Sequence, residues 1–498
     1  MAAAGFRAAA VPPLSRHEVR EMVANNPIKN TIHFIIVLLL LFGFRYLPAA
    51  GGLSDVGMQV IGVFAGVIYG WINIGIGWPS VLGIVAFGLT DHVTMTGLLS
   101  TAFGSQTMVM ITTLLLLAAF VQQADLTDLI LRFLITRRSA QGRPFLVLFY
   151  FLLAGFIACI LSHCLAVLII FLELFKEIMR KSGIAPYSDA VPCFFVGMSF
   201  SFVLGDIALP FKSTAIVGIG AYEAMTGASM DLLLYTLFML PLCLLCIASY
   251  VLCCKYLFRV DLTKLTSDNF PRIDASALPL RKKVSLAAVL VAMAALLLPS
   301  VVPSDTALAG LLSGMGLGGL SLFILAVLLI IRVDGEPLMD LQKVAGHFSW
   351  NVFFLLCFLL PIAGALSSDA IGLKQILTSG ATSFLQGLPG LAIIAVIAFM
   401  AAICTNFSNN IVVCGIFVAT ACFLGGVITM DLRAVVCIII ASSSVSIFFP
   451  AASPLNAVLF LQKELVTFRQ LFLFGIKTTI IQCLLIAIVG SLLSGVIF

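Results

Sequence analysis

Residues 441–457 of the chain read ASSSVSIFFPAASPLNA, and two opposed signals meet in this segment. It continues an apolar run that suits a membrane, yet Pro450, Ser453 and Pro454 interrupt it. Proline has no backbone N–H and leaves the carbonyl groups before it unbonded. Irregular backbone at membrane depth is tolerated only where it is buried in protein or lines a cavity. The segment therefore predicts a broken membrane helix that borders a cavity.

The composition of the whole chain agrees with a membrane setting. The chain has 498 residues, of which 61% are hydrophobic and 10% are charged. Soluble proteins carry roughly 25% charged residues, so a water-soluble fold, a disordered chain, a coiled coil and a nucleic-acid-binding protein are excluded. The length suits about ten to fourteen passes of about 20 apolar residues each. We expect an all-α polytopic protein, because the apolar runs are continuous and do not alternate.

Two pairs of apolar runs are too short and too close together to be separate passes. Ser162 and His163 separate the runs 144–161 and 164–175, and a polar stretch of five residues separates 390–404 from 410–425. Each pair predicts a re-entrant helical hairpin with a polar tip. We place the hairpins at 144–181 and 388–426, and a broken helix follows each of them, at 190–226 and 433–463. Because a hairpin followed by a broken helix recurs in both halves, the chain contains an internal repeat.

The basic residues indicate how the two repeats lie in the membrane. Lys and Arg flank the first hairpin closely, and almost none flank the second. By the positive-inside rule the first hairpin opens to the cytoplasm and the second to the outside, so the repeats are inverted. We divide the chain into a cytoplasmic N-terminal segment (1–30), a first repeat (31–258), a basic cytoplasmic linker (259–283) and a second repeat (284–498). The C-terminus is expected outside, in a multi-pass protein of the cell (inner) membrane.

The motifs of common enzymes and metal proteins are missing from the sequence. The 13 cysteines lie mostly in apolar runs, which indicates buried free thiols, and no paired CxxC or HExxH array occurs. Ser162 and His163 are neighbours in sequence, but adjacent side chains diverge and do not form a nucleophile–base pair. No GxxxxGK[ST] motif occurs, which argues against a primary pump. We expect neither an enzyme nor an organic cofactor.

The broken segment resembles a family signature. Residues 441–457 are similar to the pattern Ser…Phe-x-x-Pro-x-Ala-Thr-Pro-x-Asn-Ala of the divalent-anion/sodium symporter family, within the ion transporter superfamily. Residues 405–410, TNFSNN, resemble the hairpin tip of that family. The resemblance covers 90–498 in organisation and is strongest in 400–460. It implies a homodimer with a scaffold and an elevator-type transport domain. It also implies secondary active transport of a small organic anion, with a di- or tricarboxylate as the leading candidate, by sodium symport or anion exchange.

The resemblance also implies site residues. A sodium site would be formed by Thr405, Ser408, Asn410 and Ala452. The register of the tip allows either Ser408-Asn409 or Asn409-Asn410 to match the Ser-Asn pair of the family. The residues implied on the substrate side are Ser162, His163, Cys164, Pro210, Lys212, Asn409, Ser453, Pro454 and Asn456.

The first half departs from the family pattern. By the internal repeat Lys212 matches Asn456, and an ammonium group has no acceptor with which to ligate sodium. We hypothesise that the ammonium group of Lys212 replaces the first sodium ion and binds substrate or pairs with Asp206. The alternative is that Lys212 begins an interfacial helix and extends to water.

The coupling ion and the substrate stay open at this level. His163 or Asp206 could carry a proton, or His163 could be a neutral imidazole that donates to a carbonyl. Sodium symport with fewer ions and uncoupled exchange are further modes. Sulfate or an amino-acid-like anion is an alternative substrate. A cation/proton antiporter of the same superfamily is an alternative class, for which only Asp206 supplies an acidic group.

Overall fold

The computed structural model describes residues 27–498 apart from 50–51, 125–141, 266–278, 304, 367, 369, 373–375, 377–388 and 427. Parts of the predicted N-terminal segment and linker therefore lie outside the described residues. The first half forms α2 (Pro27–Gly43), η1 (Phe44–Tyr46), α3 (Asp55–Asn73), α4 (Gly77–Gly88), α5 (Met95–Gly104), α6 (Gln106–Ala124), α8 (Pro144–Leu161), α9 (Cys164–Ser182), α10 (Ala190–Ile207), α11 (Ser213–Thr226), α12 (Leu232–Leu252) and η3 (Cys253–Leu257). The second half forms α13 (Leu280–Leu297), η5 (Leu298–Ser300), α14 (Ala307–Ile330), β1 (Arg332–Val333), β2 (Glu336–Pro337), α15 (Leu341–Ala345), α16 (Trp350–Leu366), α18 (Gly390–Phe407), α19 (Asn410–Phe423), α20 (Leu432–Ser443), η6 (Pro450–Ala452), α21 (Pro454–Phe460) and α22 (Phe468–Ile497).

The fold is helical and suited to a membrane. In the described part of the chain, nine helices are long and apolar enough to cross a bilayer. They are α3, α6, α8, α10, α12 with η3, α13 with η5, α14, α18 and α22. Among the shorter apolar helices, α19 belongs to the second hairpin and α20 to the second broken helix. The predicted all-α polytopic class is confirmed.

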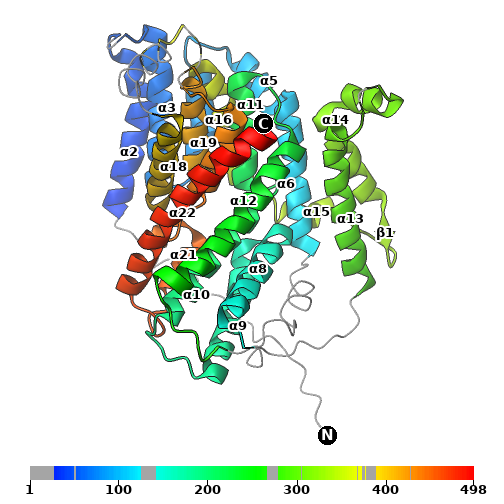
Figure 1. Ribbon diagram of the computed structural model, residues 1–498. Helices are drawn as coiled ribbons and strands as arrows, with labels where there is room; N and C mark the ends of the chain where they lie inside the picture. The colour runs from blue at the N-terminus through cyan, green and yellow to red at the C-terminus, as the bar shows by residue number, and fades with distance from the viewer. Residues whose placement is uncertain are drawn as a thin grey trace.

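Both expected hairpins form. Helices α8 and α9 are joined by Ser162 and His163 alone, and α18 and α19 by Ser408 and Asn409 alone. Figure 1 places α8 and α9 in the lower half of the molecule and α18 and α19 in the upper half. The two hairpins therefore enter from opposite ends, as the charge pattern predicts.

The polar tip residues begin the second helix of each hairpin. The first N–H groups of a helix have no partner within it, and a side-chain acceptor at the N-cap position satisfies one of them. His163 Nδ1 accepts from the N–H of Leu165 at 3.3 Å, and Asn409 Oδ1 accepts from the N–H of Ile411 at 2.9 Å. His163 and Asn409 thus occupy equivalent positions, as the internal repeat predicts.

Helices α8 and α10 pack closely because glycines leave room between them. A Cβ atom added at Gly155 would lie 1.8 Å from the ring of Phe202, and one added at Gly205 would lie 2.4 Å from the carbonyl oxygen of Phe156. Native interiors leave no space for such atoms. The glycines therefore hold the first hairpin against the first broken helix.

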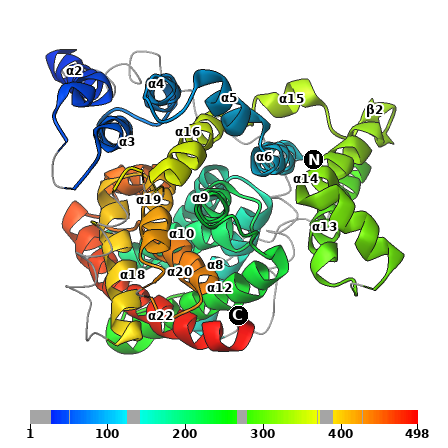
Figure 2. The same ribbon diagram turned by 90° about the horizontal axis from the view of Figure 1, so that it is seen from above.

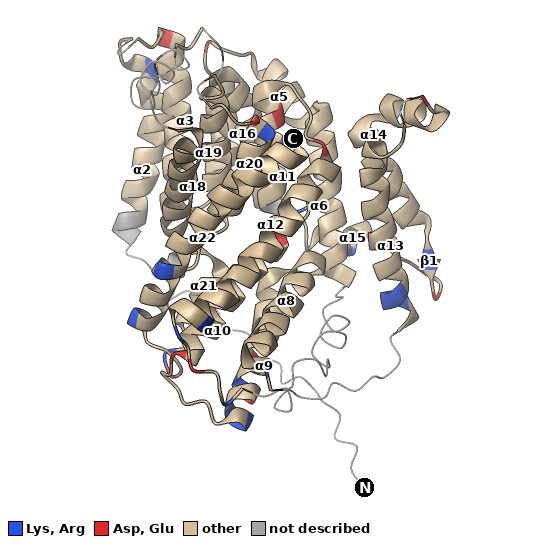
Figure 3. Cartoon of the chain, in the orientation of Figure 1, with Lys and Arg blue, Asp and Glu red and all other residues tan. Residues whose placement is uncertain are grey.

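The remaining helices surround this centre. Figure 2 shows α2–α5 along one edge and α13–α14 as a separate arm, with α6 beside that arm. The hairpins and broken helices lie together on the other side, where α11 packs against α19 and α16. Figure 3 shows more Lys and Arg at the lower end, around α9 and α13, than at the upper end.

Candidate functional site

The first half of the site is organised around Lys212. This residue lies directly before α11, in the break after α10, and is 9% exposed. Its Nζ atom donates to the carbonyl oxygens of Cys159 and Ser162, the latter at 2.7 Å, and lies 3.3 Å from Asp206 Oδ1. The interpretation of Lys212 as an interfacial lysine that extends to water is wrong, because the ammonium group is turned inward to the hairpin tip.

These contacts use all three N–H donors of the ammonium group. The two carbonyl groups belong to the C-terminal end of α8, where the helix dipole carries partial negative charge. Two backbone carbonyl oxygens and a carboxylate are also the kind of oxygen ligands that a sodium ion takes in transporters with broken helices. These three oxygen atoms can therefore stabilise one positive charge, and the ammonium group of Lys212, which is part of the chain, provides that charge.

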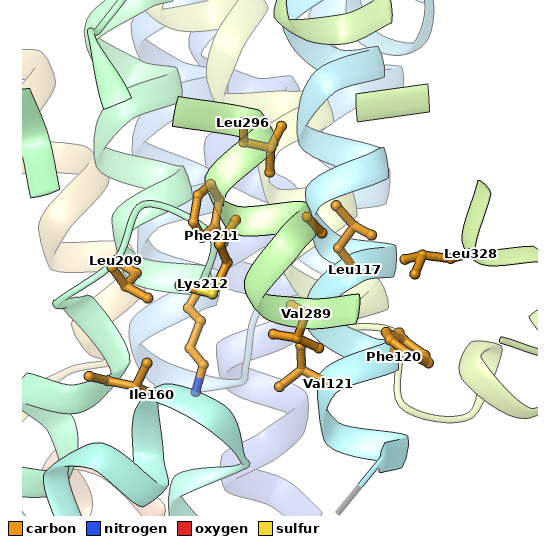
Figure 4. Close-up of a pocket in the computed structure, with 13 residues that line it drawn as sticks. Leu117, Phe120, Val121, Ile160, Leu209, Phe211, Lys212, Val289, Leu296 and Leu328 are labelled. Atoms are coloured by element: carbon orange, nitrogen blue, oxygen red, sulfur yellow. The ribbon is translucent and has the colours of Figure 1, made fainter. Parts of the chain in front are cut away.

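The surroundings of Lys212 are apolar on one side and polar on the other. Its stem lines a small cavity of about 50 Å³ with Ile160, Leu209, Phe211 and Val289, and Figure 4 shows the nitrogen pointing away from Phe211. The remaining predicted residues of this half lie on the polar side or in the break. Cys164 Sγ lies 3.7 Å from Asp206 Oδ1, Ser162 and Pro210 are buried, and the His163 ring is exposed at the tip.

The second half is held together by Asn406, a residue that the sequence analysis did not select. Its Nδ2 atom donates to the carbonyls of Ala402 and Val445 at 2.7 and 2.8 Å. Its Oδ1 atom accepts from the N–H groups of Ile447 and Phe448, both at 2.9 Å. The side chain is 0% exposed and joins the second hairpin to the broken segment. The available signal was an asparagine in the polar stretch between the two apolar runs, directly after Thr405.

The predicted sodium residues largely come together. Thr405 Oγ1 lies 2.8 Å from Asn410 Oδ1 and 2.6 Å from the carbonyl of Ser443. Ser408 Oγ is buried with no hydrogen-bond partner, and Ala452 belongs to η6, which packs against α18. A buried hydroxyl without a partner needs an explanation. Hydroxyl, amide and backbone oxygens fit a sodium ion, so this is the set that could hold one.

The remaining substrate-side residues separate into exposed and internal positions. Asn409 is exposed at the hairpin tip, whereas Ser453 caps α21, which begins at Pro454. Asn456 is 1% exposed, and its Oδ1 atom accepts from Ser199 Oγ at 2.5 Å. Its Nδ2 atom donates to two carbonyls of the broken segment. Asn456 therefore ties α10 to α21 in this structure.

The helix boundaries also change one correspondence between the repeats. Lys212 directly precedes α11, as Ser453 directly precedes α21, whereas Asn456 lies inside the first turn of α21. Lys212 thus occupies the position equivalent to Ser453 when the helix starts are matched. The proline positions had suggested Asn456, because the break in the first half is shorter.

Paired hairpin tips and helix breaks that bring polar groups together inside a polytopic helical protein are typical of a secondary transporter. A model of the citrate transporter family matches residues 60–426. The chain belongs to the citrate transporter family. The match ends before residues 441–457, and the finer assignment to the divalent-anion/sodium symporter family stays a prediction.

The fold is also found in a solved transporter. The chain is similar to the YdaH transporter of Alcanivorax borkumensis, whose crystal structure is described as having an unusual topology. The TM-score is 0.52 at 14% sequence identity, over 94% of this chain and 98% of that chain. At this identity the likeness shows a shared fold alone. A search of curated proteins finds no match.

Proposed function

We propose that the chain transports a small di- or tricarboxylate across the cell membrane, with the Lys212 ammonium group as a fixed cation in place of one sodium ion. The observation that carries this proposal is the set of contacts of Lys212 with the carbonyls of Cys159 and Ser162 and with Asp206. A fixed charge does not leave the protein during transport. The first site therefore contributes no ion gradient, and exchange of one anion for another becomes the simplest mode.

The anion is expected to bind between the two hairpin tips. The N-terminal ends of α9 and α19 start at these tips and carry partial positive charge, which favours a carboxylate. His163 and Asn409 are exposed there, and Ser453 borders the second break. The sodium set of Thr405, Ser408, Asn410 and Ala452 would add one cation to the other half of the site.

An elevator movement accounts for the two-part arrangement. The moving part would comprise the hairpins and broken helices, α8–α11 and α18–α21, and the scaffold would include α2–α6 and α13–α14. Two copies of the chain would form a dimer through their scaffolds. The lower end in Figure 3, where Lys and Arg gather, would face the cytoplasm by the positive-inside rule. The C-terminus would then face outside.

The test is uptake of labelled succinate and citrate into proteoliposomes. Sodium outside is present or replaced by choline, and unlabelled substrate inside is present or absent. We expect uptake that requires internal substrate, with at most a partial sodium dependence. Uptake that requires outside sodium and no internal substrate would contradict the role of Lys212 as a replacement ion. Uptake of sulfate or an amino acid with no uptake of either carboxylate would overturn the substrate class.

A further inference from the structure

A second cavity lies at the opposite end of α11 from Lys212. Its volume is about 780 Å³, and it lies between the C-terminal end of α11, the start of α6 and the segment that runs from η5 into α14. Gln106, Thr107 and Met110 of α6 line it, and α14 lines it around Gly316, where the helix is kinked. Gln106 and the loop after α11 are exposed, so water reaches this cavity.

Glu223 is the single acidic or basic residue that lines this cavity in the described part of the chain. Its Oε1 atom accepts one hydrogen bond, from the N–H of Met230 at 3.0 Å. It lies in the last turn of α11, where the free carbonyl groups of the helix carry partial negative charge. Both the helix end and the partial burial of the side chain therefore disfavour a negative charge at Glu223.

The helices packed against α11 offer no free cation to Glu223. Helices α6, α16 and α19, which pack against α11, and α14, which lines the cavity, contain no Asp, Glu, Lys, Arg, His or Tyr. Cysteines are the titratable groups of α16 and α19. The charged groups of the other neighbours already have partners, and Tyr222 is the other titratable group of α11. Asp206 of α10 pairs with Lys212, Arg433 of α20 bonds its cap residue Asp431 at 2.7 Å, and Asp231 beyond Met230 accepts from Ser300 Oγ at 2.9 Å.

The surface along which Glu223 would move is apolar. Helix α6 contacts α11 and carries Gln106, Thr107 and Met110 beside the second cavity, and then Leu117 and Val121 beside Lys212. The threonines between these levels bond to their own helix, with Thr112 Oγ1 donating to Met108 O at 2.7 Å and Thr113 Oγ1 to Val109 O at 2.9 Å. Between these two levels no polar side chain of α6 remains to receive a carboxylate that leaves the cavity, because the other amides of the helix, Gln122 and Gln123, lie at its far end.

We propose that Glu223 is a proton-binding site that must be neutral before α11 can move along α6. This gate rests on the proposed elevator function and goes beyond it, because it lies outside the substrate site and names a second ligand, the proton. The charge of the Lys212–Asp206 pair is balanced within the moving part, whereas that of ionised Glu223 is not. Because the proton is needed in both directions of movement, it sets the transport rate and does not drive accumulation.

The experiment measures exchange of labelled for unlabelled substrate in proteoliposomes, with equal pH on both sides, at several pH values. The variants are Glu223→Gln, Glu223→Asp and, as a matched control, Glu173→Gln, which removes an exposed carboxylate paired with Lys176 at 3.0 Å. The substrate itself changes its protonation with pH in the same way for the wild type and for every variant. Differences between their pH profiles therefore come from the protein. We expect the wild-type rate to fall about tenfold per pH unit once Glu223 is mostly ionised. The Glu223→Gln rate should stay at the low-pH value, and Glu223→Asp and Glu173→Gln should keep a falling profile.

The outcomes separate the gate from the proposed function. A Glu223→Gln profile that falls like the wild-type profile overturns the gate and leaves carboxylate exchange intact. An inactive Glu223→Gln beside an active Glu223→Asp also overturns it, because a carboxylate would then be required as such. Accumulation driven by a pH gradient in the wild type, lost in Glu223→Gln, would replace the gate with proton coupling. Absence of exchange at every pH would overturn the proposed function and the gate together.

Discussion

Replacing Lys212 with asparagine should create a sodium requirement. The substitution removes the charge and leaves Asp206 facing two carbonyl oxygens at the tip of the first hairpin. Breaking a buried ion pair by removing one partner costs about 3–5 kcal/mol. The Asp206 side chain is 29% exposed, so we expect about 3 kcal/mol, at the low end. The asparagine also leaves space in which a cation can bind the same oxygens.

Sodium should restore much of this loss. A ligand that binds only the folded state stabilises it by about 2.7 kcal/mol at a concentration 100 times its Kd. The thermal midpoint of Lys212→Asn should therefore rise as sodium replaces choline at constant ionic strength. Its exchange activity should become sodium-dependent over the same range. The wild type should show neither effect at this site, because the ammonium group already occupies it.

Matched variants make the result specific. Lys176→Asn removes a lysine that is also paired with a carboxylate, at 3.0 Å, but on the surface, and its sodium response should equal that of the wild type. Lys212→Met cannot supply an amide ligand and should be less stable without full recovery in sodium. If Lys212→Asn responds to sodium as the wild type does, the ammonium group does not stand in for a sodium ion.

Three further substitutions test the packing and the second half of the site. Asn406→Ala leaves two buried N–H groups without an acceptor and should lower the free energy of unfolding by about 2–4 kcal/mol; a loss below about 1 kcal/mol in thermal or chemical unfolding would show that water replaces the amide. Gly205→Ala forces a Cβ atom to within 2.4 Å of a carbonyl oxygen and should cost about 1–3 kcal/mol, whereas Gly314→Ala meets no atom within 4 Å and should be neutral or stabilising in the same unfolding assay. Ser408→Ala should leave stability in choline unchanged and weaken the sodium-dependent rise of the thermal midpoint. Ser201→Ala removes another buried hydroxyl without a partner and should leave that rise intact. Equal behaviour of the two variants would remove Ser408 from the sodium set.

The architecture was predictable from the sequence because membrane proteins obey few and strong rules. Continuous apolar runs without charge predict helices, since every backbone group in a bilayer needs a partner within its own segment. Runs too short to cross, separated by Ser162-His163 or by the TNFSN stretch, predict the hairpins, and α8–α9 and α18–α19 form at those places. Pro450 and Pro454 predict the second break for the same reason of lost backbone donors.

The sequence offered Asp206 as one of two partners for Lys212, the other being the substrate, because a charge close to a helix break in an apolar region needs a partner. It did not determine which groups complete the coordination of the ammonium. Those are carbonyl oxygens of Cys159 and Ser162, about 50 residues away, and the chain brings them together only when α8 packs on α10. Backbone carbonyls carry no signature in a sequence, so a site made from them is visible only after folding.

For side chains the sequence is limited in the same way, as Asn406, Asn456 and Glu223 show. The sequence marks each as a polar residue in an apolar helix and cannot separate a structural amide from a ligand. Tertiary packing decided that Asn406 and Asn456 form hydrogen bonds with backbone carbonyls of the chain. It also decided that Glu223 borders a cavity whose described lining contains no Lys or Arg. The sequence alone thus determined that polar groups are buried in membrane helices and that each needs a partner, since burying a polar group without a hydrogen bond costs free energy. Whether such a group has a structural or a binding role depends on which partners lie within hydrogen-bond distance, and only the assembled helices set those distances.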